Sequence, residues 1–404
     1  MPTVVLLGTL DTKGKEYDFL RDRVLEHGVD VVLIDAGIMG EPLAVPDITR
    51  EEVAGAAGAD VQALAAAGDR GAAVETMAEG AATVVSRLHA EGRLDGILGL
   101  GGSGNSALVT QAMRALPVGV PKLMVSTVAS GDTRPYVGAV DIAMMYSVVD
   151  IAGVNRISAQ IMTNAAGMIA GAVTSRVPDL GADRPLIGAS MFGVTTPCVT
   201  TARERLEELG YEVLVFHATG TGGQSMEALA KGGFLAGILD VTTTELADEL
   251  VGGVLSAGPD RLEAAGELGL PQVVSLGALD MVNFGPRESV PERFADRNLY
   301  VHNPTITLMR TTPEECLALG RQIGHKLSAA TGPTALFIPL RGVSMIAVEG
   351  QVFHDPEADA ALIQGLHETL GPAVEVHQLE LDVNDPAFAT AMADRLHAMI
   401  EEDQ

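Results

Sequence analysis

Residues 8–16 of the chain, with the sequence GTLDTKGKE, combine side chains that bind phosphate and its counter-ion. The segment directly follows an apolar run, so we expect a helix to begin here, capped by Asp11 or Thr12, with free N–H groups that bind an anion. Lys13 and Lys15 would add positive charge for phosphate, and Asp11 would hold Mg²⁺ through water. The alternative is a solvated turn whose lysines extend into water.

A second glycine-rich segment, GLGGSGNS, occupies residues 99–106. Its glycines allow the backbone to approach a ligand closely, and its serines and asparagine offer polar groups at a helix start. The spacing matches neither GxGxxG nor GxxxxGK[ST], so it does not identify the ligand. A glycine-rich turn between a strand and a helix nevertheless favours a phosphate cradle over a simple packing turn.

The third segment, STVASGDTRPY at residues 126–136, also follows a predicted strand. Asp132 in it would bind a metal ion or a ribose, and Arg134 would bind phosphate. The alternative is a local turn in which Arg134 pairs with Asp132. Because the ends of neighbouring parallel strands meet at one edge of a sheet, the three segments together predict a nucleotide site.

The second half of the chain offers four candidates for catalysis in polar segments: His217, Asp280, His302 and Arg341. The first three would make an acid–base or metal set, but no spacing such as HExxH supports one, and a histidine in a loop is more often structural. Glycines after the strand EVLVF again precede a predicted helix. Asp240 and Glu245 flank three threonines that resemble a helix cap.

Cys198 and Cys316 are the two cysteines, which excludes a disulfide framework and favours a reducing cytoplasm. Cys198 is predicted in a first helical turn, after Thr196 as N-cap and Pro197. A thiol there can have a lowered pKa, but we favour a small buried residue.

Charge and length exclude several classes of function. The chain has 404 residues and a formal net charge of −27, which opposes binding to nucleic acid or anionic membranes. No apolar run reaches the roughly 18 residues of a membrane span, and the N-terminus lacks the basic region of a signal peptide. We therefore expect a cytoplasmic protein with no nucleic-acid or membrane partner.

Short apolar runs alternate with amphipathic stretches, which predicts an α/β fold of two doubly wound Rossmann-like domains with mainly parallel sheets. A polar stretch containing Pro178 and Gly181 places the boundary near residue 180, giving domains 1–180 and 181–404. Residues 39–60 are predicted to be irregular. Strands are predicted at 3–7, 29–34, 96–100, 122–126, 142–145, 185–191, 212–216, 236–240, 272–276, 335–338 and 373–378. Helices are predicted at 14–27, 73–91, 106–115, 156–173, 197–209, 244–251, 313–329, 358–369 and 386–401.

Eight motifs, in order along the whole chain, resemble those of the Tm-one-like ATP-binding proteins. They are GTLDTKGKE, GLGGSGNS, STVASGDT, HATGTGG, DVTTTE, GALDMVNFGP, HNPTITLMRTT and PLRGVSM. The resemblance implies two α/β subdomains, ATP in the N-terminal one with a divalent cation, and a homodimer or higher homo-oligomer. Nucleotide-binding roles would fall to Thr9, Asp11, Lys13, Gly101, Gly102, Ser103, Gly104, Ser126 and Asp132, with Asp11 and Asp132 as ligands of Mg²⁺. Asn105 replaces a glycine of the family's loop, and we expect the loop to survive because Asn tolerates left-handed backbone angles.

The predicted function is therefore an ATP-binding protein, with a Mg²⁺-dependent enzyme as the leading hypothesis. A small acid or carbonyl substrate, not identified by the sequence, would bind in an interdomain cleft and be activated there; the second domain would hold this substrate or regulate. One alternative is a nucleotide-dependent regulatory protein without turnover. Another is an ATP-independent lyase or hydrolase centred on the second domain.

Overall fold

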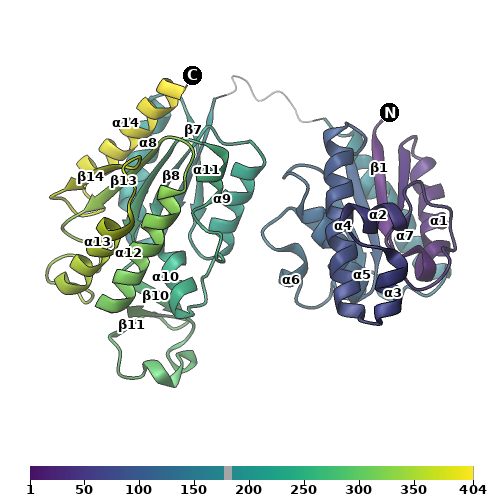
Figure 1. Ribbon diagram of the computed structural model, residues 1–404, viewed down its shortest axis with the longest axis horizontal. Helices are drawn as coiled ribbons and strands as arrows, with labels where there is room; N and C mark the ends of the chain where they lie inside the picture. Colours follow the sequence, from purple (N-terminus) through teal and green to yellow (C-terminus); the bar gives the residue numbers. More distant parts are fainter. Residues whose placement is uncertain (177–183, 404) are drawn as a thin grey trace. The chain divides into compact units, whose positions relative to one another are not determined.

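The computed structural model describes residues 1–176 and 184–403, which pack as two compact units, Met1–Asp179 and Leu180–Gln404 (Figure 1). Each unit is built on a parallel β-sheet with helices on both faces, which confirms the predicted fold class. The boundary predicted near residue 180, with Pro178 and Gly181, lies outside the described residues. No helix in the described residues is long and apolar enough to cross a membrane.

The sheet of the N-terminal unit has the strand order β2-β1-β3-β4-β5 within residues 1–176, and every pair is parallel. After β1 the chain crosses over to β2, which lies on one side of β1. The next crossover leads to β3, which lies on the other side of β1. The two crossovers therefore diverge between β1 and β3, where open α/β sheets bind their ligands. The strands are β1 (Thr3–Gly8), β2 (Asp30–Asp35), β3 (Gly96–Gly101), β4 (Lys122–Ser126) and β5 (Ile142–Tyr146).

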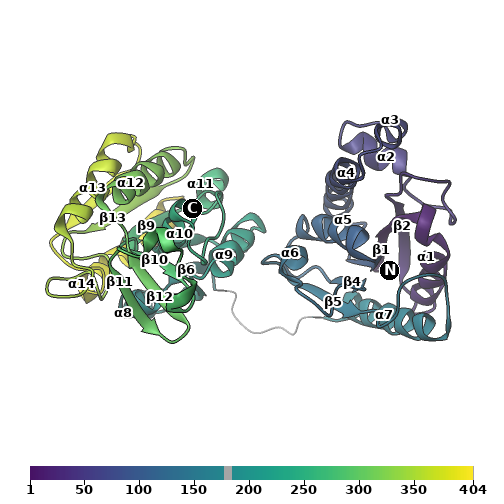
Figure 2. The same ribbon diagram turned by 90° about the horizontal axis from the view of Figure 1, so that it is seen from below.

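Helices cover both faces of this sheet (Figure 2). On one face α1 (Leu10–Leu25) and α7 (Arg156–Thr174) pack their apolar sides on the strands, and on the other face α4 (Arg70–Ala90) and α5 (Ser103–Arg114) do the same. The segment predicted to be irregular, residues 39–60, contains α2 (Arg50–Ala56), which a Thr49–Glu52 capping box begins. Within residues 1–176, the unit also contains two short helices, α3 (Val61–Ala67) and α6 (Arg134–Val137).

The C-terminal unit has a parallel sheet in the order β14-β13-β9-β8-β6-β7 within residues 184–403. Helices α8 and α14 bury one face, and α9 to α13 lie over the other. The strands are β6 (Leu186–Met191), β7 (Glu212–His217), β8 (Gly237–Thr242), β9 (Gln272–Gly277), β13 (Thr334–Pro339) and β14 (Glu375–Leu379). The helices are α8 (Thr196–Glu208), α9 (Thr221–Lys231), α10 (Thr244–Val251), α11 (Ala264–Leu268), α12 (Pro313–Ser328), α13 (Pro356–Thr369) and α14 (Pro386–Asp403).

A small antiparallel sheet was not predicted from the sequence. Its order is β10-β12-β11, formed by β10 (Met281–Phe284), β11 (Leu299–Asn303) and β12 (Ile306–Arg310). All four residues of β10 are buried, so the strand lacks the alternation of apolar and polar residues that identifies a half-exposed strand. The motifs GALDMVNFGP and HNPTITLMRTT therefore contain strands that pair with each other.

Candidate functional site

A cavity of about 600 Å³ lies at the point where the crossovers diverge in the N-terminal unit. Its wall is formed by the first residues of α1, α4 and α5 together with the segments that follow β2 and β5. The lining residues include Thr9, Asp11, Thr12, Lys13, Ile38, Met39, Leu64, Asp69, Arg70, Val74, Met77, Gly102, Ser103, Gly104, Asn105, Leu108 and Asp150. Six of the predicted nucleotide-binding residues, Thr9, Asp11, Lys13, Gly102, Ser103 and Gly104, are thus brought together.

Helix α1 begins four residues earlier than predicted, because a single residue, Thr9, connects it to β1. Thr9, and not Asp11 or Thr12, is the N-cap residue, and its side chain does not cap the helix. The first amide of the helix, that of Leu10, instead donates to Asp35 Oδ1 over 2.9 Å. Burial raises the pKa of Asp35. Asp11 and Lys13 consequently project from the first helical turn.

Asp11 holds the segment after β2 against the cavity. One of its carboxylate oxygens accepts from the Met39 amide over 2.8 Å, while the other, Oδ1, is buried and has no partner among the described residues. An added Cβ at Gly37 would stand 2.7 Å from this carboxylate, so the close approach requires glycine. Asp11 therefore places Met39 on the wall, and its buried Oδ1 has no hydrogen-bond partner among the described residues.

Helix α5 begins at Ser103, not at the predicted Ser106, so the glycine-rich segment forms its first turn. Gly102, the N-cap residue, has no side chain to cap the helix, and the first amide with a backbone acceptor is that of Ser106. Within the part of the chain that the structure describes, the amides of Ser103, Gly104 and Asn105 have no acceptor. Such a helix start favours an anion.

Asn105 lies in the helix and has no positive φ, so its tolerance of left-handed backbone angles is not needed here. Its Nδ2 donates to the Leu100 carbonyl and packs over Gly101, where an added Cβ would stand 2.6 Å from the Asn105 Cβ. The buried Tyr17 hydroxyl accepts from the Leu100 amide over 3.0 Å and donates to the Leu7 carbonyl, which ties the ends of β1 and β3 together. This network fixes the floor beneath the cavity.

Arg70, the first residue of α4, is a cation of the cavity that the sequence analysis missed. Its guanidinium lies 3.5 Å from the position that a Cβ on Gly104 would take, beside the free amides of α5. Among the described residues it makes no ion pair. No motif surrounds Arg70, and about 30 residues separate it from Gly102, so only the packing of α4 on α5 reveals its place.

The segment after β5 closes the side of the cavity next to α1. Lys13 donates to the Ile151 carbonyl, and Glu16 accepts from the Gly153 amide over 2.6 Å. Val148 has a φ of 62°, a strained value for a β-branched residue, and such strain often accompanies functional segments. The segment places Asp150 on the wall, a carboxylate that was not predicted from the sequence.

Three of the predicted nucleotide-binding residues lie away from the wall. Gly101 is beneath Asn105, and Ser126 is buried, sharing a hydrogen bond of 2.7 Å with the Ser106 hydroxyl. Asp132 is in a surface loop, where Arg134 Nη2 donates to it over 2.8 Å and the Arg134 side chain lowers its pKa to about 2. The segment is therefore the local turn, with Arg134 paired to Asp132, that was the alternative to a ligand site. Asp132 does not line the cavity that Asp11 lines.

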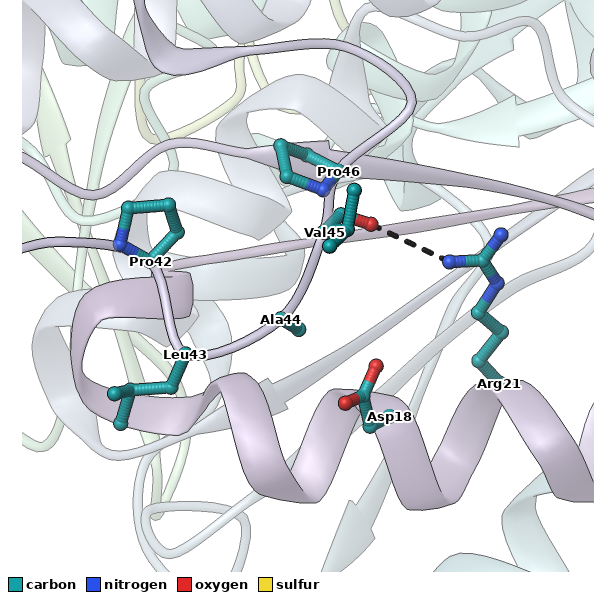
Figure 3. A pocket seen from close by; sticks show the side chains of 7 residues that line it. All are labelled: Asp18, Arg21, Pro42, Leu43, Ala44, Val45 and Pro46. Atoms are coloured by element: carbon teal, nitrogen blue, oxygen red, sulfur yellow. Dashed lines mark hydrogen bonds between the residues drawn. The ribbon is translucent and has the colours of Figure 1, made fainter.

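A second hollow, of about 660 Å³, lies between α1 and the segment Pro42–Pro46 (Figure 3). Asp18 and Arg21 line it, and Arg21 donates to the Val45 carbonyl over 3.3 Å. Its wall contains neither a free helix start nor any predicted site residue.

In the C-terminal unit the four predicted catalytic residues are dispersed. His217, at the end of β7, is exposed beside Phe192, and His302 is exposed on β11. Arg341 pairs at the surface with Glu380 over 3.2 Å, whereas Asp280 is buried and accepts from Ser344 Oγ over 2.8 Å. Burial raises the pKa of Asp280 to about 6.

No hydrogen bond or ion pair joins any two of these four residues within 184–403. Likewise, no group of three or more His, Cys, Asp or Glu side chains in the described ranges has an arrangement that could hold a metal ion. The predicted acid–base or metal set is therefore not assembled in this unit.

The glycine-rich segment of the C-terminal unit differs from that of the N-terminal unit in one respect. Glu245 Oε1 accepts from the amides of Gly220 and Gly223 over 2.7 and 3.0 Å, so an internal carboxylate occupies the start of α9. The fully buried Arg261 in turn donates to Glu245 and Asp240 over 2.7 and 2.5 Å. This helix start, which lies within the motif HATGTGG, is already bound by an internal carboxylate.

Cys198 is fully buried, and burial raises the pKa of its thiol to about 12. The interpretation as a small core residue is confirmed. The N-cap of α8 is Thr195, one residue before the predicted position.

We expect Asp248 to make the stability of the C-terminal unit depend on pH. It is fully buried, accepts from Asn283 Nδ2 over 2.7 Å, and has a pKa raised by burial to about 7. The folded chain therefore holds a proton here that the unfolded chain releases above its ordinary pKa of about 4. Stability should fall by roughly 3 kcal/mol as the pH rises from 4 to 7.

We expect Asp248→Asn to remove this part of the pH dependence, because the amide keeps the shape without titrating. Urea unfolding at pH 4.5, 6 and 7.5, followed by far-UV circular dichroism, measures the effect. Equal slopes of stability against pH in the two proteins would contradict the assignment.

Comparison with known proteins gives two family matches and several relatives. A family model described as "Uncharacterised protein family (UPF0261) N-terminal domain" matches residues 2–178. A second model, described as "Uncharacterised protein family (UPF0261) C-terminal domain", matches residues 184–400. A UPF0261 protein of Clostridium tetani is 54% identical over 98% of this chain and 99% of its own length. The ToMV resistance protein Tm-1(GCR237) of Solanum lycopersicum is 39% identical over 97% of this chain and 55% of its own length. This match confirms the family likeness that the motifs indicated, and it does not bear on ATP binding. A UDP-N-acetylglucosamine 2-epimerase structure from Rickettsia bellii aligns over 68% of this chain and 78% of its own at 11% identity, with a TM-score of 0.24.

Proposed function

The chain belongs to the uncharacterised protein family UPF0261, and from the geometry of its N-terminal unit we propose that it binds a nucleoside triphosphate such as ATP, together with Mg²⁺. One observation carries the proposal: three helices begin at a single cavity that also holds two cations. Helices α1, α4 and α5 contribute their first turns, with Lys13 and Arg70 beside them.

Electrostatics explain why a phosphate chain suits this cavity in so acidic a protein. Helix α5 begins with three amides that have no acceptor among the described residues, and phosphate oxygens accept hydrogen bonds from such amides and from charged side chains. Lys13 also bonds Ile151, which holds its ammonium group at the wall. The cavity volume of about 600 Å³ falls in the range of small-molecule sites.

The residues present fit a magnesium ion carried by the nucleotide. Mg²⁺ is commonly held by one or two carboxylates together with substrate phosphates. Asp11 has a buried oxygen without a partner, and Asp150 lies on the same wall, so these two carboxylates would hold the ion. The bound Mg²⁺ would offset the charge of the phosphates. Asp132, predicted as the second ligand, is paired with Arg134 and does not line the cavity.

We expect Lys13→Ala to weaken binding of Mg²⁺–ATP by about 10- to 100-fold, the usual effect of losing a charge-assisted bond to phosphate. Isothermal titration calorimetry measures the affinity, and the melting temperature checks that the link to Ile151 is not needed for folding. Lys15→Ala is the matched control, because Lys15 is exposed and does not line the cavity. Absence of ATP binding to the unmodified protein at millimolar concentration would end the proposal.

A further inference from the structure

Helix α3 lines the cavity, yet little attaches it to the rest of the N-terminal unit. Of its seven residues only Val61 is buried and Leu64 is half-buried, whereas the other five are exposed. Among the described residues no hydrogen bond joins α3 to another helix or to a strand; the amides of Ala63 and Leu64 bond to Asp60, directly before the helix. Leu64 and Ala65 nevertheless belong to the cavity wall. The helix is therefore a wall element that few contacts hold in place.

A glycine in the left-handed backbone conformation lies on each side of α3. Gly58 has a φ of 72° and Gly68 has a φ of 68°, values that residues other than glycine rarely adopt. A Cβ added at either position would meet no atom within 4 Å, so the backbone conformation, and not a lack of space, requires glycine there. Hinges are a few residues at the ends of an element that absorb large changes of φ and ψ. Gly58 and Gly68 therefore mark the two positions about which α3 can turn.

Helix α2 shows how a helix of the same length is attached more firmly. Both helices have seven residues, which is too short for a stable helix in water, so each depends on its packing. Helix α2 buries Val53 and Ala54, and it packs so closely on α4 that a Cβ added at Gly80 would stand 2.0 Å from the Val53 carbonyl oxygen. Helix α3 buries one side chain, that of Val61. Because segments with few buried apolar contacts open at a low cost in free energy, we expect α3 to open more readily than α2.

Resting on the proposed function, we propose that α3 is a lid, which opens to admit the nucleotide and closes over it once it is bound. A ligand shifts the balance between two conformations only through contacts that it makes better in one of them. Leu64 and Ala65 lie on the lid, Arg70 follows two residues after Gly68, and all of them line the cavity. A bound nucleotide can therefore hold both the lid itself and the chain next to its hinge.

Hydrogen–deuterium exchange of the full chain, followed by mass spectrometry, tests the lid. Without nucleotide, the amides of α3 should exchange at least about tenfold faster than those of α2, and saturating Mg²⁺–ATP should remove most of this difference. If calorimetry shows that ATP binds while the exchange of α3 stays unchanged, the lid is overturned and the proposed function stands. If no ATP binds, the proposed function itself fails, and the lid fails with it.

Leu64→Ser provides a second measurement, because it shortens the apolar side chain with which the lid would contact the ligand. The affinity for Mg²⁺–ATP should fall by about tenfold, and the loss should arise from faster dissociation. Calorimetry measures the affinity, displacement of a fluorescent ATP analogue by excess ATP measures the dissociation rate, and the melting temperature checks folding. Gln62→Ser is the matched control, since Gln62 is exposed on α3 and does not line the cavity. Equal dissociation rates for the two variants would overturn the inference.

Discussion

Replacing Arg261 by Met should lower the free energy of unfolding of the C-terminal unit by about 5 kcal/mol or more, enough to unfold a typical domain. Arg261 is fully buried and lies within 3.4 Å of three carboxylates, those of Asp240, Glu245 and Glu227. Removing one member of a single buried pair costs roughly 3–5 kcal/mol, because the remaining charge has no partner and no water. Here one cation faces three acidic side chains.

The loss should extend beyond the ion pairs, since Arg261 also fixes Glu245 at the start of α9. Without the guanidinium, only the amides of Gly220 and Gly223 would oppose the effect of burial, which already raises the pKa of Glu245, and the carboxyl would take up a proton. The amides of Gly220 and Gly223 would then lose a charged acceptor. The ends of β8 and α9 should therefore loosen together.

Urea unfolding of the full chain at pH 7, followed by far-UV circular dichroism, measures this effect. Arg341→Met is the control, because Arg341 pairs with Glu380 at the surface and such pairs contribute less than about 1 kcal/mol. If Arg261→Met fails to fold, Arg261→Lys, which keeps the charge, should be soluble and of intermediate stability. A change below about 2 kcal/mol for Arg261→Met would show that the carboxylates do not depend on this cation.

Glu245 and Arg261 explain why two similar glycine-rich segments, one in each unit, have different helix starts. The segments GLGGSGNS and HATGTGGQSME both lie between a strand and a helix, and local sequence alone does not distinguish them. In the C-terminal unit, Glu245 lies 25 and 22 residues from Gly220 and Gly223, whose amides it binds, and Arg261 lies another 16 residues on. A contact at such a distance in sequence is set by the packing of the sheet.

The alternation of strands and helices was predictable because buried parallel strands are short apolar runs and their helices are amphipathic. Helix starts were less predictable: α1 and α5 begin four and three residues earlier than expected, since glycine and threonine are compatible with either a turn or a first helical turn. Of the site residues, those within one motif, such as Lys13 and Ser103, were found. Arg70 and Asp150 were missed because they reach the cavity only through tertiary packing.

Gly104→Asp should weaken binding of Mg²⁺–ATP by more than about 100-fold while leaving the protein equally stable or slightly more stable. Gly104 is the second residue of α5, and a Cβ there would meet only Arg70 Nη2, at 3.5 Å, so the side chain fits. An aspartate in a first helical turn interacts favourably with the helix dipole, by about 0.3–1 kcal/mol. It would also pair with Arg70, and thereby supply internally the negative charge that the phosphates are proposed to supply.

Opposite signs for stability and binding make this substitution informative, because general damage to the fold would lower both. The C-terminal unit shows the arrangement already, with Glu245 at the start of α9. Calorimetry measures the affinity and thermal unfolding measures the stability. Gly104→Asn adds the same volume without the charge, so the difference between the Asp and Asn variants isolates electrostatics. If the Asp variant binds ATP as tightly as the Asn variant, the phosphates do not lie at the start of α5. The nucleotide site must then be placed elsewhere.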